Sequence, residues 1–531
     1  MQRWNGWGDR DVQMDLPPEG LAMLQDLLGK GHSQPDFPLK KFLERIPDSR
    51  LPEHPLISVD PKLRLDHAHG QSLPDWIRMR GGTLRRFPDG VAQPATIEEI
   101  QEILQFATEN DIIVIPFGGG TSVVGHLEVP ATKRPVLSLA LHRFNRLIRL
   151  EPENLLATFE AGVRGPDLEK QLNTKGFTLG HYPQSFEYSS LGGWVITRSS
   201  GQQSRHYGRI ETLFAGGEVL TPRGPLQLPP FPASAAGPDL RQLLLGSEGR
   251  IGVLTKVIVR ISRLPEKDDI YGVFFPSWDH AKAGVQELAG SGLQFSMIRL
   301  SNAKETRVNL SLAGHRHQKQ LLNRYLLLRG ISQDQACMGL VGFTGSRRTV
   351  RNMRRQALAI LRRHGAISVG KAIGKAWKKN RFRSAYLRNT LWDLGYAVDT
   401  LETAVSWSKV SATMAAIEKS IGSCAETWAE RILVFSHLSH AYSSGSSIYT
   451  TYIFRLAATP QDTLNCWKMT KQSASQAVVT AGGTISHQHG VGLDHRPYLI
   501  SEKGAIGIST LQQILLHLDP DRRMNPTKLV P

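Results

Sequence analysis

The sequence predicts an α+β protein with more than one domain, and three observations carry this prediction. The chain has 531 residues, too many for one hydrophobic core, so roughly two to four domains are expected. From Arg86 to about Pro265, short apolar runs alternate with glycines, a texture typical of strands and tight turns. After Pro265 the pattern becomes longer and more mixed, and several stretches there favour helices.

The first elements can be placed from local signals. Residues 1–85 are rich in proline, tryptophan and polar turns, and they predict an irregular arm with a helical stretch at Gly20–Leu28. Ile97–Glu109 repeats apolar residues at helical spacing. Thr96 is its expected N-cap, and Glu98 and Glu99 fall in the first turn, where the helix dipole favours acidic residues.

The remaining elements follow from short apolar runs and amphipathic stretches. Strands are expected at Ile112–Pro116, Val136–Leu139, Leu155–Glu160, Glu211–Leu220 and Ile251–Ile261. Helices are expected at Arg347–His364, Thr463–Ala481 and Ile508–Leu518.

The bulk composition is that of an ordinary globular protein, with 40% hydrophobic and 21% charged residues. No apolar run approaches the roughly 18 residues of a membrane span, and the first residues lack the features of a secretory signal. The three cysteines, Cys337, Cys424 and Cys466, are far apart in sequence, which argues against a disulfide framework or a cysteine zinc site. A cytoplasmic protein is therefore expected.

The net charge of +17 comes largely from two basic stretches, Arg347–Arg363 and Lys371–Arg388. They favour either an anion-facing surface, for phosphate ligands or acidic lipid, or a pair of solvated helix faces. No nucleic-acid-binding signature accompanies the charge, so nucleic acid is not an expected partner.

A triple-glycine loop follows the strand at Ile112–Pro116. Successive glycines let backbone N–H groups point into one concavity that suits anionic oxygens, and two hydroxyl residues follow them. The loop is neither a Walker A motif nor a Rossmann fingerprint, because Val123 stands where the third spaced glycine would be. By itself such a loop is more often a plain tight turn.

Two later segments favour the ligand-binding interpretation. Gln184–Trp194 and Thr197–Gly201 bring hydroxyls and a glycine pair, and Gly246–Thr255 brings small residues at the start of a strand. Small residues let backbone approach a flat ring, and apolar residues can line its faces. The three segments together predict clamps on an elongated dinucleotide.

In this order, the motifs PFGGGTS, SSLGGWVITRSSG and GSEGRIGVLT resemble those of the vanillyl-alcohol-oxidase/PCMH family of flavoproteins. Within that family, the chain is similar over nearly its whole length to the alkyldihydroxyacetonephosphate synthase branch. The similar segments, in the same order, are Arg3–Gly8, Ile298–Leu300, Glu402–Thr403, Gly445–Tyr449 and Ser486–Gly492.

The resemblance implies a PCMH-type FAD-binding domain, a cap domain built on an antiparallel sheet, and a helical C-terminal segment. The expected division is a helical and irregular arm at 1–85, the FAD-binding domain at 86–266, the substrate or cap domain at 267–460, and a C-terminal segment that completes the active site at 461–531.

The resemblance also implies FAD as cofactor. Noncovalent binding is expected, because His126 and His181 lie near these segments without a strong attachment motif. The implied cofactor contacts are Pro116, Phe117, Gly118, Gly119, Gly120, Thr121, Ser122, Gln184, Ser185, Ser189, Ser190, Gly192, Gly193, Thr197, Arg198, Ser199, Ser200, Glu248, Gly249, Ile251, Gly252, Val253 and Leu254.

Catalytic and substrate-binding roles are likewise implied by the resemblance. They fall on Tyr449 as acid or base, Arg299 near the flavin, His487 and His489 in the histidine tract, and Arg388 at the substrate. Because a tyrosine has an ordinary pKa of about 10, a nearby cation such as Arg299 or a histidine is expected to help it ionise.

The histidine tract departs from the branch, which normally has three histidines. Gln488 replaces the middle one, and an amide can form hydrogen bonds but cannot carry a proton at neutral pH. His487 and His489 could instead form a metal pair with Asp494 or His495, but no metal is expected.

Three functions stay open. The first is a synthase-like transferase that exchanges the acyl group of acyl-dihydroxyacetone phosphate for a fatty alcohol through a flavin adduct, in ether-lipid synthesis. The second is an FAD-linked dehydrogenase or oxidase of a 2-hydroxy acid or glycerol 3-phosphate. The third is a basic membrane- or nucleic-acid-binding module without chemistry.

The expected partners follow from these functions. They are a small phosphate or hydroxy-acid substrate, with lipid included. A homodimer and peripheral association with the inner face of a membrane also stay open.

Overall fold

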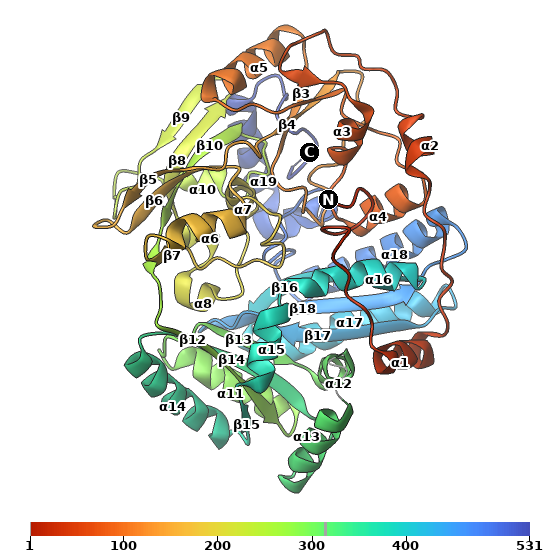
Figure 1. Cartoon of the computed structure of the whole chain (residues 1–531), viewed down its shortest axis with the longest axis vertical. Coiled ribbons are helices and arrows are strands. Elements are labelled where there is room, and N and C mark those ends of the chain that lie inside the picture. Colours follow the sequence, from red (N-terminus) through yellow and green to blue (C-terminus); the bar gives the residue numbers. More distant parts are fainter. Residues whose placement is uncertain (1, 313–315, 531) are drawn as a thin grey trace.

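The computed structural model describes residues 2–312 and 316–530, and it places two sheet-based units one above the other (Figure 1). We call them the glycine-loop unit, which contains β1 to β11, and the cap unit, which contains β12 to β18. An N-terminal arm runs along both units. Its elements are α1 (Pro18–Leu28), α2 (Leu39–Leu43), β1 (Ile57–Ser58), α3 (Pro61–Asp66) and α4 (Leu73–Arg80).

The glycine-loop unit contains two main sheets. The first has the order β1-β2-β4-β3, with β2, β3 and β4 parallel, and α5 packs against it. The second has the order β5-β6-β10-β8-β9 and is antiparallel throughout. The bounds are β2 (Gly90–Ala92), α5 (Ile97–Glu109), β3 (Ile113–Phe117), β4 (Val136–Ala140), β5 (Leu147–Glu151), β6 (Leu156–Glu160), β8 (Phe214–Thr221), β9 (Gly224–Leu228) and β10 (Val253–Arg260).

Short helices connect the strands of the second sheet, and β7 pairs with β11 in a small ribbon. Their bounds are α6 (Gly165–Asn173), β7 (Phe177–Thr178), α7 (Leu191–Thr197), α8 (Ser204–Tyr207), α9 (Ile210–Leu213), α10 (Arg241–Leu244) and β11 (Ser262–Arg263).

The cap unit is built on a seven-stranded antiparallel sheet with the order β15-β12-β14-β13-β17-β18-β16. Its strands are β12 (Lys267–Phe275), β13 (Met297–Ser301), β14 (Cys337–Gly345), β15 (Ile367–Gly370), β16 (Tyr396–Ser406), β17 (Ile432–Leu438) and β18 (Gly445–Arg455). Its helices are α11 (Trp278–Gly290), α12 (Ala303–Leu312), α13 (Arg316–Leu328), α14 (Arg347–Arg363), α15 (Ala372–Asn380), α16 (Leu387–Asp393) and α17 (Val410–Glu426). The prediction of an α+β fold with an antiparallel-sheet cap is confirmed.

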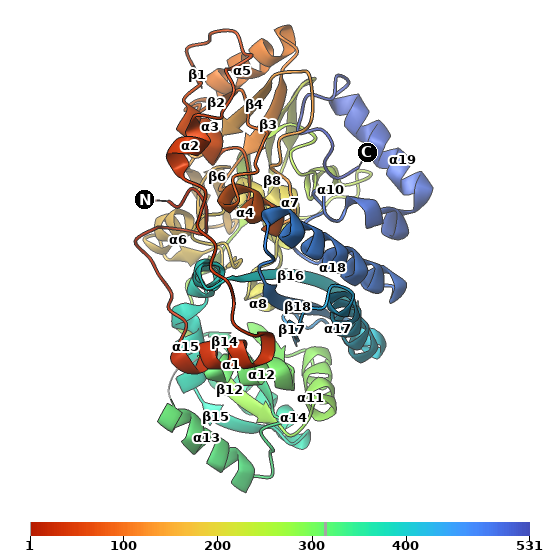
Figure 2. The ribbon, with the colours of Figure 1, turned by 90° about the vertical axis from the view of Figure 1, so that its right-hand side faces the viewer.

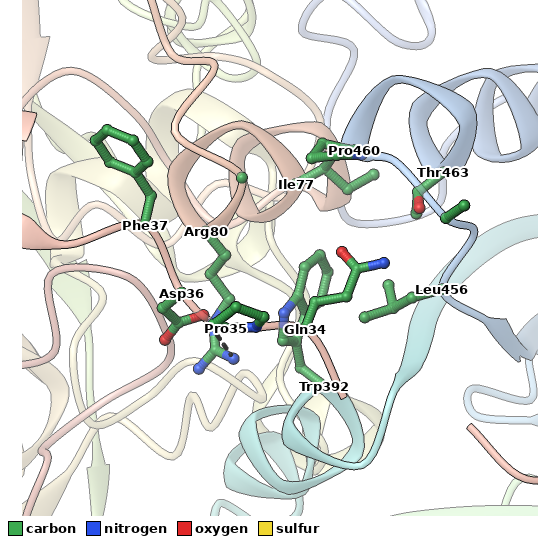
Figure 3. A pocket seen from close by; sticks show the side chains of 12 residues that line it. Gln34, Pro35, Asp36, Phe37, Ile77, Arg80, Trp392, Leu456, Pro460 and Thr463 are labelled. Atoms are coloured by element: carbon green, nitrogen blue, oxygen red, sulfur yellow. Dashed lines mark ion pairs between the residues drawn. The ribbon is translucent and has the colours of Figure 1, made fainter. Parts of the chain in front are cut away.

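The C-terminal segment joins the two units. The helix α18 (Pro460–Thr480) packs on α17 in the cap unit, whereas α19 (Ile500–Leu518) returns to the glycine-loop unit (Figure 2). Beyond α19, Met524 is buried beside β3, and the N–H of Asn525 bonds to the carbonyl of Val114. The segment from α18 to the end of the chain therefore contacts both units.

The predicted helix Ile97–Glu109 is confirmed residue for residue, and Thr96 caps it by accepting a hydrogen bond from the N–H of Glu99 at 3.2 Å. The strand expected at Glu211–Leu220 is partly wrong. Ile210–Leu213 forms one helical turn, and the strand begins at Phe214. The expected helix Ile508–Leu518 is the second half of α19, which bends where Gly504 adopts a φ of +67°.

The two basic stretches have different structures. In α14 the apolar residues face the core and most of the arginines face solvent, as in an ordinary amphipathic surface helix. The stretch Lys371–Arg388 instead bends inward, so that Arg381 and Arg388 lie mostly enclosed. No helix of the described residues is long and apolar enough to cross a membrane.

Candidate active site

A row of polar residues crosses three neighbouring strands of the cap sheet. In the strand register, Tyr449 on β18 lies opposite both Glu402 on β16 and His437 on β17. Directly opposed residues of antiparallel strands project from the same face of the sheet. Glu402, Tyr449 and His437 therefore form a row on one face, which we call the catalytic row.

Arg299 lies beside one end of the catalytic row. Its Nη2 donates to Oε1 of Glu305 at 2.7 Å, and that oxygen lies 2.9 Å from Nδ1 of His437. Burial of Glu305 would raise its pKa, but the adjacent His437 and Arg299 outweigh burial and hold the pKa at about 2. Arg299 is thus fixed by a buried carboxylate in a position next to Tyr449.

Tyr449 is enclosed by the aromatic rings of two histidines. Its ring stacks on His437 with centroids 5.0 Å apart and meets His489 edge-on at 5.7 Å, and its hydroxyl donates to Oγ1 of Thr400 at 3.2 Å. Burial, with added repulsion from Glu402, raises the pKa of Tyr449 to about 12, although Arg299 pulls in the other direction. Arg299 thus favours the ionised tyrosine, as expected, but burial and the carboxylates outweigh it.

Glu402 anchors the histidine tract above the row. Its Oε1 accepts hydrogen bonds from the backbone N–H groups of Gln488 at 2.6 Å and His489 at 2.7 Å. The Nδ1 atom of His489 lies 3.6 Å from the same oxygen. Two amide donors to one fully buried carboxylate define the position of the tract relative to Tyr449.

His487 has different neighbours from His489. Its Nε2 lies 2.7 Å from Nη1 of Arg209 and 2.6 Å from the hydroxyl of Tyr442, and Arg209 also donates to the carbonyl of His487. A guanidinium at this distance leaves no room for a metal on that nitrogen. Among the described residues, no group of three or more His, Cys, Asp and Glu side chains is arranged to hold a metal ion.

Arg388 presents an incompletely paired cation. Its Nη1 donates to the carbonyl of Gln71 at 2.5 Å, and its guanidinium lies 4.3 Å above the ring of Trp76. The Nε and Nη2 atoms are buried and have no partner in the described part of the chain. Burial lowers the pKa of Arg388 to about 10, against attraction from Asp399 and Asp75. It stays charged at neutral pH, and its two free donors suit a bound anion.

The glycine loop packs tightly against the other two predicted cofactor segments. A side chain at Gly119 would come within 1.9 Å of the carbonyl oxygen of Tyr188, and one at Gly118 would meet Oγ of Ser190 at 2.3 Å. Gly249 has a φ of +78° and lies against Pro116. The three segments therefore converge, as the sequence predicts for clamps on one ligand.

The backbone of this loop is free to bind an anion. Within the described ranges, the N–H groups of residues 118–122 donate no hydrogen bond to protein acceptors. The five residues are partly exposed. Consecutive unpaired amides around glycines form the kind of nest that binds a diphosphate, so the loop fits the expected cofactor.

Several other predicted cofactor residues use their side chains within the protein. Ser189 accepts from the indole of Trp194, and Ser199 bonds to His181. Ile251, Val253 and Leu254 are buried in the hydrophobic cores of the unit. The side chains of these three residues therefore face the core, and the backbone of Val253 and Leu254 pairs with β8.

The remaining residues of the second segment are also placed by local bonds. Ser185 accepts from Tyr188 and Ser189, Gln184 donates to Arg381, Thr197 donates to Gly193, and Gly192 packs on Ala161. Arg198 ends α7 with a φ of +53°. This segment is thus a rigid turn.

Glu248 links the third segment to the histidine tract. Its carboxylate accepts from the N–H groups of Val491 at 2.5 Å and Gly492 at 2.9 Å, and it lies 2.9 Å from Nε2 of His126. The resemblance made Glu248 a cofactor residue, and here its side chain fastens the tract to the glycine-loop unit. Its neighbour Gly252 packs on Leu220, where a Cβ would lie 2.3 Å from the carbonyl oxygen.

A second contact joins the cofactor segments to the catalytic row. Oγ of Ser200 lies 3.0 Å from Nε2 of His440, whose ring in turn lies 4.9 Å from that of His487. The tract and the row are therefore next to the segment that the sequence assigns to the flavin.

Four polar residues of this centre escaped the sequence-based prediction, namely His437, Glu305, Arg209 and Tyr442. No local motif marks them: His437, Arg209 and Tyr442 contact residues at least twelve positions away, and Glu305 lies in the helix after the strand that carries Arg299. Of the four, only His437 could have been indicated by the sequence, because side chains alternate along β17 and His437 lies opposite Tyr449.

Comparisons with known proteins agree with this geometry. An FAD binding domain model matches residues 88–227, and the model of the FAD linked oxidases, C-terminal domain, matches residues 264–529. An alkyldihydroxyacetonephosphate synthase of Dictyostelium discoideum is 30% identical over 100% of this chain and 93% of its own length. One from Caenorhabditis elegans is 29% identical over 98% and 93%, respectively.

Solved structures extend the likeness. An alkyldihydroxyacetonephosphate synthase is 26% identical and superposes with a TM-score of 0.85 over 99% of both chains. p-Cresol methylhydroxylase, at 12% identity and a TM-score of 0.67 over 96% of this chain and 95% of its own, shares the fold. A cytochrome D-lactate dehydrogenase of Saccharomyces cerevisiae is more distant, with 25% identity over 82% of this chain and 71% of its own length.

The cofactor is FAD, since both domain models describe FAD proteins and the glycine loop fits its diphosphate. The full-length relative at 30% identity and the domain model that matches half of the chain show the family. This protein belongs to the alkyldihydroxyacetonephosphate synthase family of FAD-linked enzymes.

Proposed function

We propose that this enzyme exchanges the acyl group of acyl-dihydroxyacetone phosphate for a fatty alcohol, as an alkyldihydroxyacetonephosphate synthase. The observation that carries the proposal is Arg388, a buried cation with two unpaired donors. A buried charge without a partner is costly unless a ligand supplies the counter-charge. A phosphate bound to Nε and Nη2 would place the rest of the substrate towards Tyr449, which is near enough to Arg388 to affect the pKa of the guanidinium.

The exchange needs proton transfer but no net electron transfer. The alcohol loses one proton, the acyl group leaves as a carboxylate, and one ether bond replaces one ester bond. FAD, when bound, supplies the reactive ring. Tyr449 is protonated at neutral pH and would start as a proton donor, while the neighbouring His489 would accept the proton of the alcohol. The guanidinium of Arg299 would stabilise negative charge that develops on the substrate next to Tyr449.

The alternative is an FAD-linked dehydrogenase or oxidase of a 2-hydroxy acid or glycerol 3-phosphate, because Arg388 would bind a carboxylate as readily as a phosphate. Metal-dependent dehydrogenases of this kind often carry a segment resembling His-Gly-Asp-Gly-Asn-x-His. The corresponding stretch, His440–Tyr449, lacks the Asp and Asn and ends in tyrosine.

A direct assay separates the two functions. Holoenzyme given palmitoyl-dihydroxyacetone phosphate and hexadecanol is expected to form an ether bond with no electron acceptor consumed. Arg388→Met, which keeps the volume and removes the charge, is expected to retain FAD but to lose at least about tenfold in kcat/KM, the loss of one charge-assisted contact. Arg134→Met, at a guanidinium bonded to the backbone carbonyls of Asp111 and Asp521, is the matched control.

The opposite results would reject the proposal. Persistent bleaching of the flavin by glycerol 3-phosphate or a hydroxy acid, with electrons passed to an acceptor dye, would identify a dehydrogenase. Undiminished kcat/KM in Arg388→Met would remove this arginine from the substrate site.

Peripheral binding to an anionic membrane is a further part of the proposal, since the substrates carry long alkyl chains. The supporting observation is α13, at the end of the cap unit far from the glycine-loop unit (Figure 1). Leu321, Tyr325 and Leu328 are spaced four and three residues apart, so they form one outward stripe, and Leu328 is 85% exposed. Exposed Arg324 and Arg329 lie beside the stripe.

An apolar stripe with an interfacial tyrosine and adjacent arginines is the composition of a helix that lies in a lipid headgroup layer. The inner face of α13 is anchored by Leu322 and Leu326 in a separate hydrophobic cluster. The helix therefore does not need its outer leucines to stay folded onto the cap unit.

Co-sedimentation with vesicles tests this surface. The double variant Leu321→Gln/Leu328→Gln is expected to bind phosphatidylglycerol-containing vesicles at least about 100-fold more weakly, as the lost burial of two leucine side chains predicts. Ile506→Gln, at an equally exposed apolar residue of α19, is expected to bind like the wild type. Unchanged vesicle binding in the double variant would reject the surface, and dissociation of a dimer instead would assign the stripe to a second copy of the chain.

A further inference from the structure

The hydrogen-bond donors around His487 determine which of its ring nitrogens carries the proton. Arg209 cannot lose its proton at any physiological pH, so its Nη1, 2.7 Å from Nε2 of His487, must donate. The same Nη1 also donates to the hydroxyl of Tyr442 at 3.2 Å, and this hydroxyl lies 2.6 Å from Nε2. Nε2 is therefore an acceptor, and the neutral ring carries its proton on Nδ1.

From these contacts, the geometry points to Arg209 and Tyr442 as positioning residues that lock His487 in the Nδ1–H tautomer, so that His487 serves as a fixed hydrogen-bond donor and not as a proton carrier. The inference rests on the proposed function only for the identity of the acceptor, which would be a carbonyl or an ionised oxygen of the bound substrate or cofactor.

The surroundings of Nδ1 fit a donor kept for a ligand. This atom is buried and has no hydrogen-bond partner in the described part of the chain. Its nearest carboxylate oxygen is Oε2 of Glu402, at 3.9 Å, which itself lacks a hydrogen-bond donor. A fully desolvated N–H without a partner is rare in a protein unless a bound group completes it.

The groups around the ring, taken together, disfavour a second proton on His487. Arg209 contacts one side, and His440 faces the ring at 4.9 Å. His489 lies two residues along the tract. Glu402 opposes these cations from 3.9 Å, and Glu211 is already paired with Nε of Arg209 at 2.7 Å. Burial, His440 and Arg209 together hold the pKa of His487 well below its usual value.

The fixed tautomer of His487 limits which residue of the histidine tract can carry a proton. Gln488 cannot carry a proton, and His487 is held in one neutral form, so His489 is the residue of the tract that can exchange protons with Tyr449. The replacement of a histidine by Gln488 then removes no proton carrier that this arrangement needs. Arg209 itself is placed by its ion pair with Glu211 and by the turn that begins α9.

Nitrogen NMR of the holoenzyme labelled with ¹⁵N-histidine tests the lock without any substrate. The His487 signal, assigned by its loss in His487→Gln, is expected to show the Nδ1–H tautomer and to stay unchanged from about pH 5.5 to 9. In Arg209→Met the pKa of the ring is expected to rise, because one of the cations that lower it is removed, and the preference for the Nδ1–H tautomer is expected to weaken. The pH profile of kcat/KM should then gain an acidic limb.

Two further variants complete the test. Arg209→Lys keeps a cationic donor and is expected to restore the wild-type tautomer, whereas Arg134→Met should leave the His487 signal unchanged. An Nε2–H tautomer in the wild type, or a His487 signal that does not respond to Arg209→Met, would overturn the inference. Because the spectrum requires no turnover, either result stands apart from the outcome of the ether-bond assay.

Discussion

Tyr449→Phe is expected to retain FAD and to lose about 10²- to 10⁴-fold in turnover, the usual contribution of one acid–base group. Only the hydroxyl is removed, and it contributes a single hydrogen bond, to Thr400. The ring would keep its stack on His437, and the register of β18 with β16 and β17 would not change. The loss should therefore appear in kcat and leave the cofactor in place.

Flavin absorbance of the purified variant and steady-state kinetics measure the two parts of this prediction. Tyr271→Phe is the matched control, because Tyr271 is buried in the same sheet and its hydroxyl accepts a hydrogen bond from Arg354, outside the catalytic row. Wild-type turnover in Tyr449→Phe would exclude this hydroxyl from the chemistry. Loss of FAD in the variant would show that Tyr449 acts on cofactor binding instead.

Local signals in the sequence were sufficient for some of the regular elements. Ile97–Glu109 carries both an apolar period and a capping threonine, and the observed helix has the same first and last residues. The expected strand from Glu211 was wrong at its start because Arg209 and Glu211 pair with each other and a helical turn forms first. Apolar content alone does not distinguish such a turn from a strand.

The catalytic centre shows where sequence-based prediction ends. Tyr449 was selected through the family resemblance, and its partners His437 and Glu402 become visible only when three strands pair in one register. Arg209 reaches the centre from a segment far from it in sequence, and Glu305 contacts His437 across 132 residues. Such contacts depend on tertiary packing, which a local pattern does not encode.

The direction of the Tyr449 pKa shift also depends on tertiary packing. The sequence offers a nearby cation, and this alone would lower the pKa. The structure adds burial and the carboxylate of Glu402 directly opposite, and these raise it to about 12. Charges and burial compete at such a site, and only coordinates show which of them is stronger.

Gly119→Ala is expected to abolish FAD retention. The new Cβ would lie 1.9 Å from the carbonyl oxygen of Tyr188, which belongs to a rigid turn and cannot rotate away. The glycine loop must then move from the 184–190 segment, and the amides that form the diphosphate nest lose their common direction. Purified variant should be colourless, and its melting temperature should respond less to added FAD than that of the wild type.

A neighbouring glycine gives a graded comparison. At Gly118 the nearest atom is the side-chain Oγ of Ser190, which can rotate, so Gly118→Ala should weaken FAD binding less than Gly119→Ala does. Gly290→Ala, at the end of α11 with no atom within 4 Å of the new Cβ, should bind FAD normally. Equal retention of FAD by Gly118→Ala and Gly119→Ala would contradict the packing argument. The backbone of Tyr188 would then not be the boundary that holds the loop in its binding conformation.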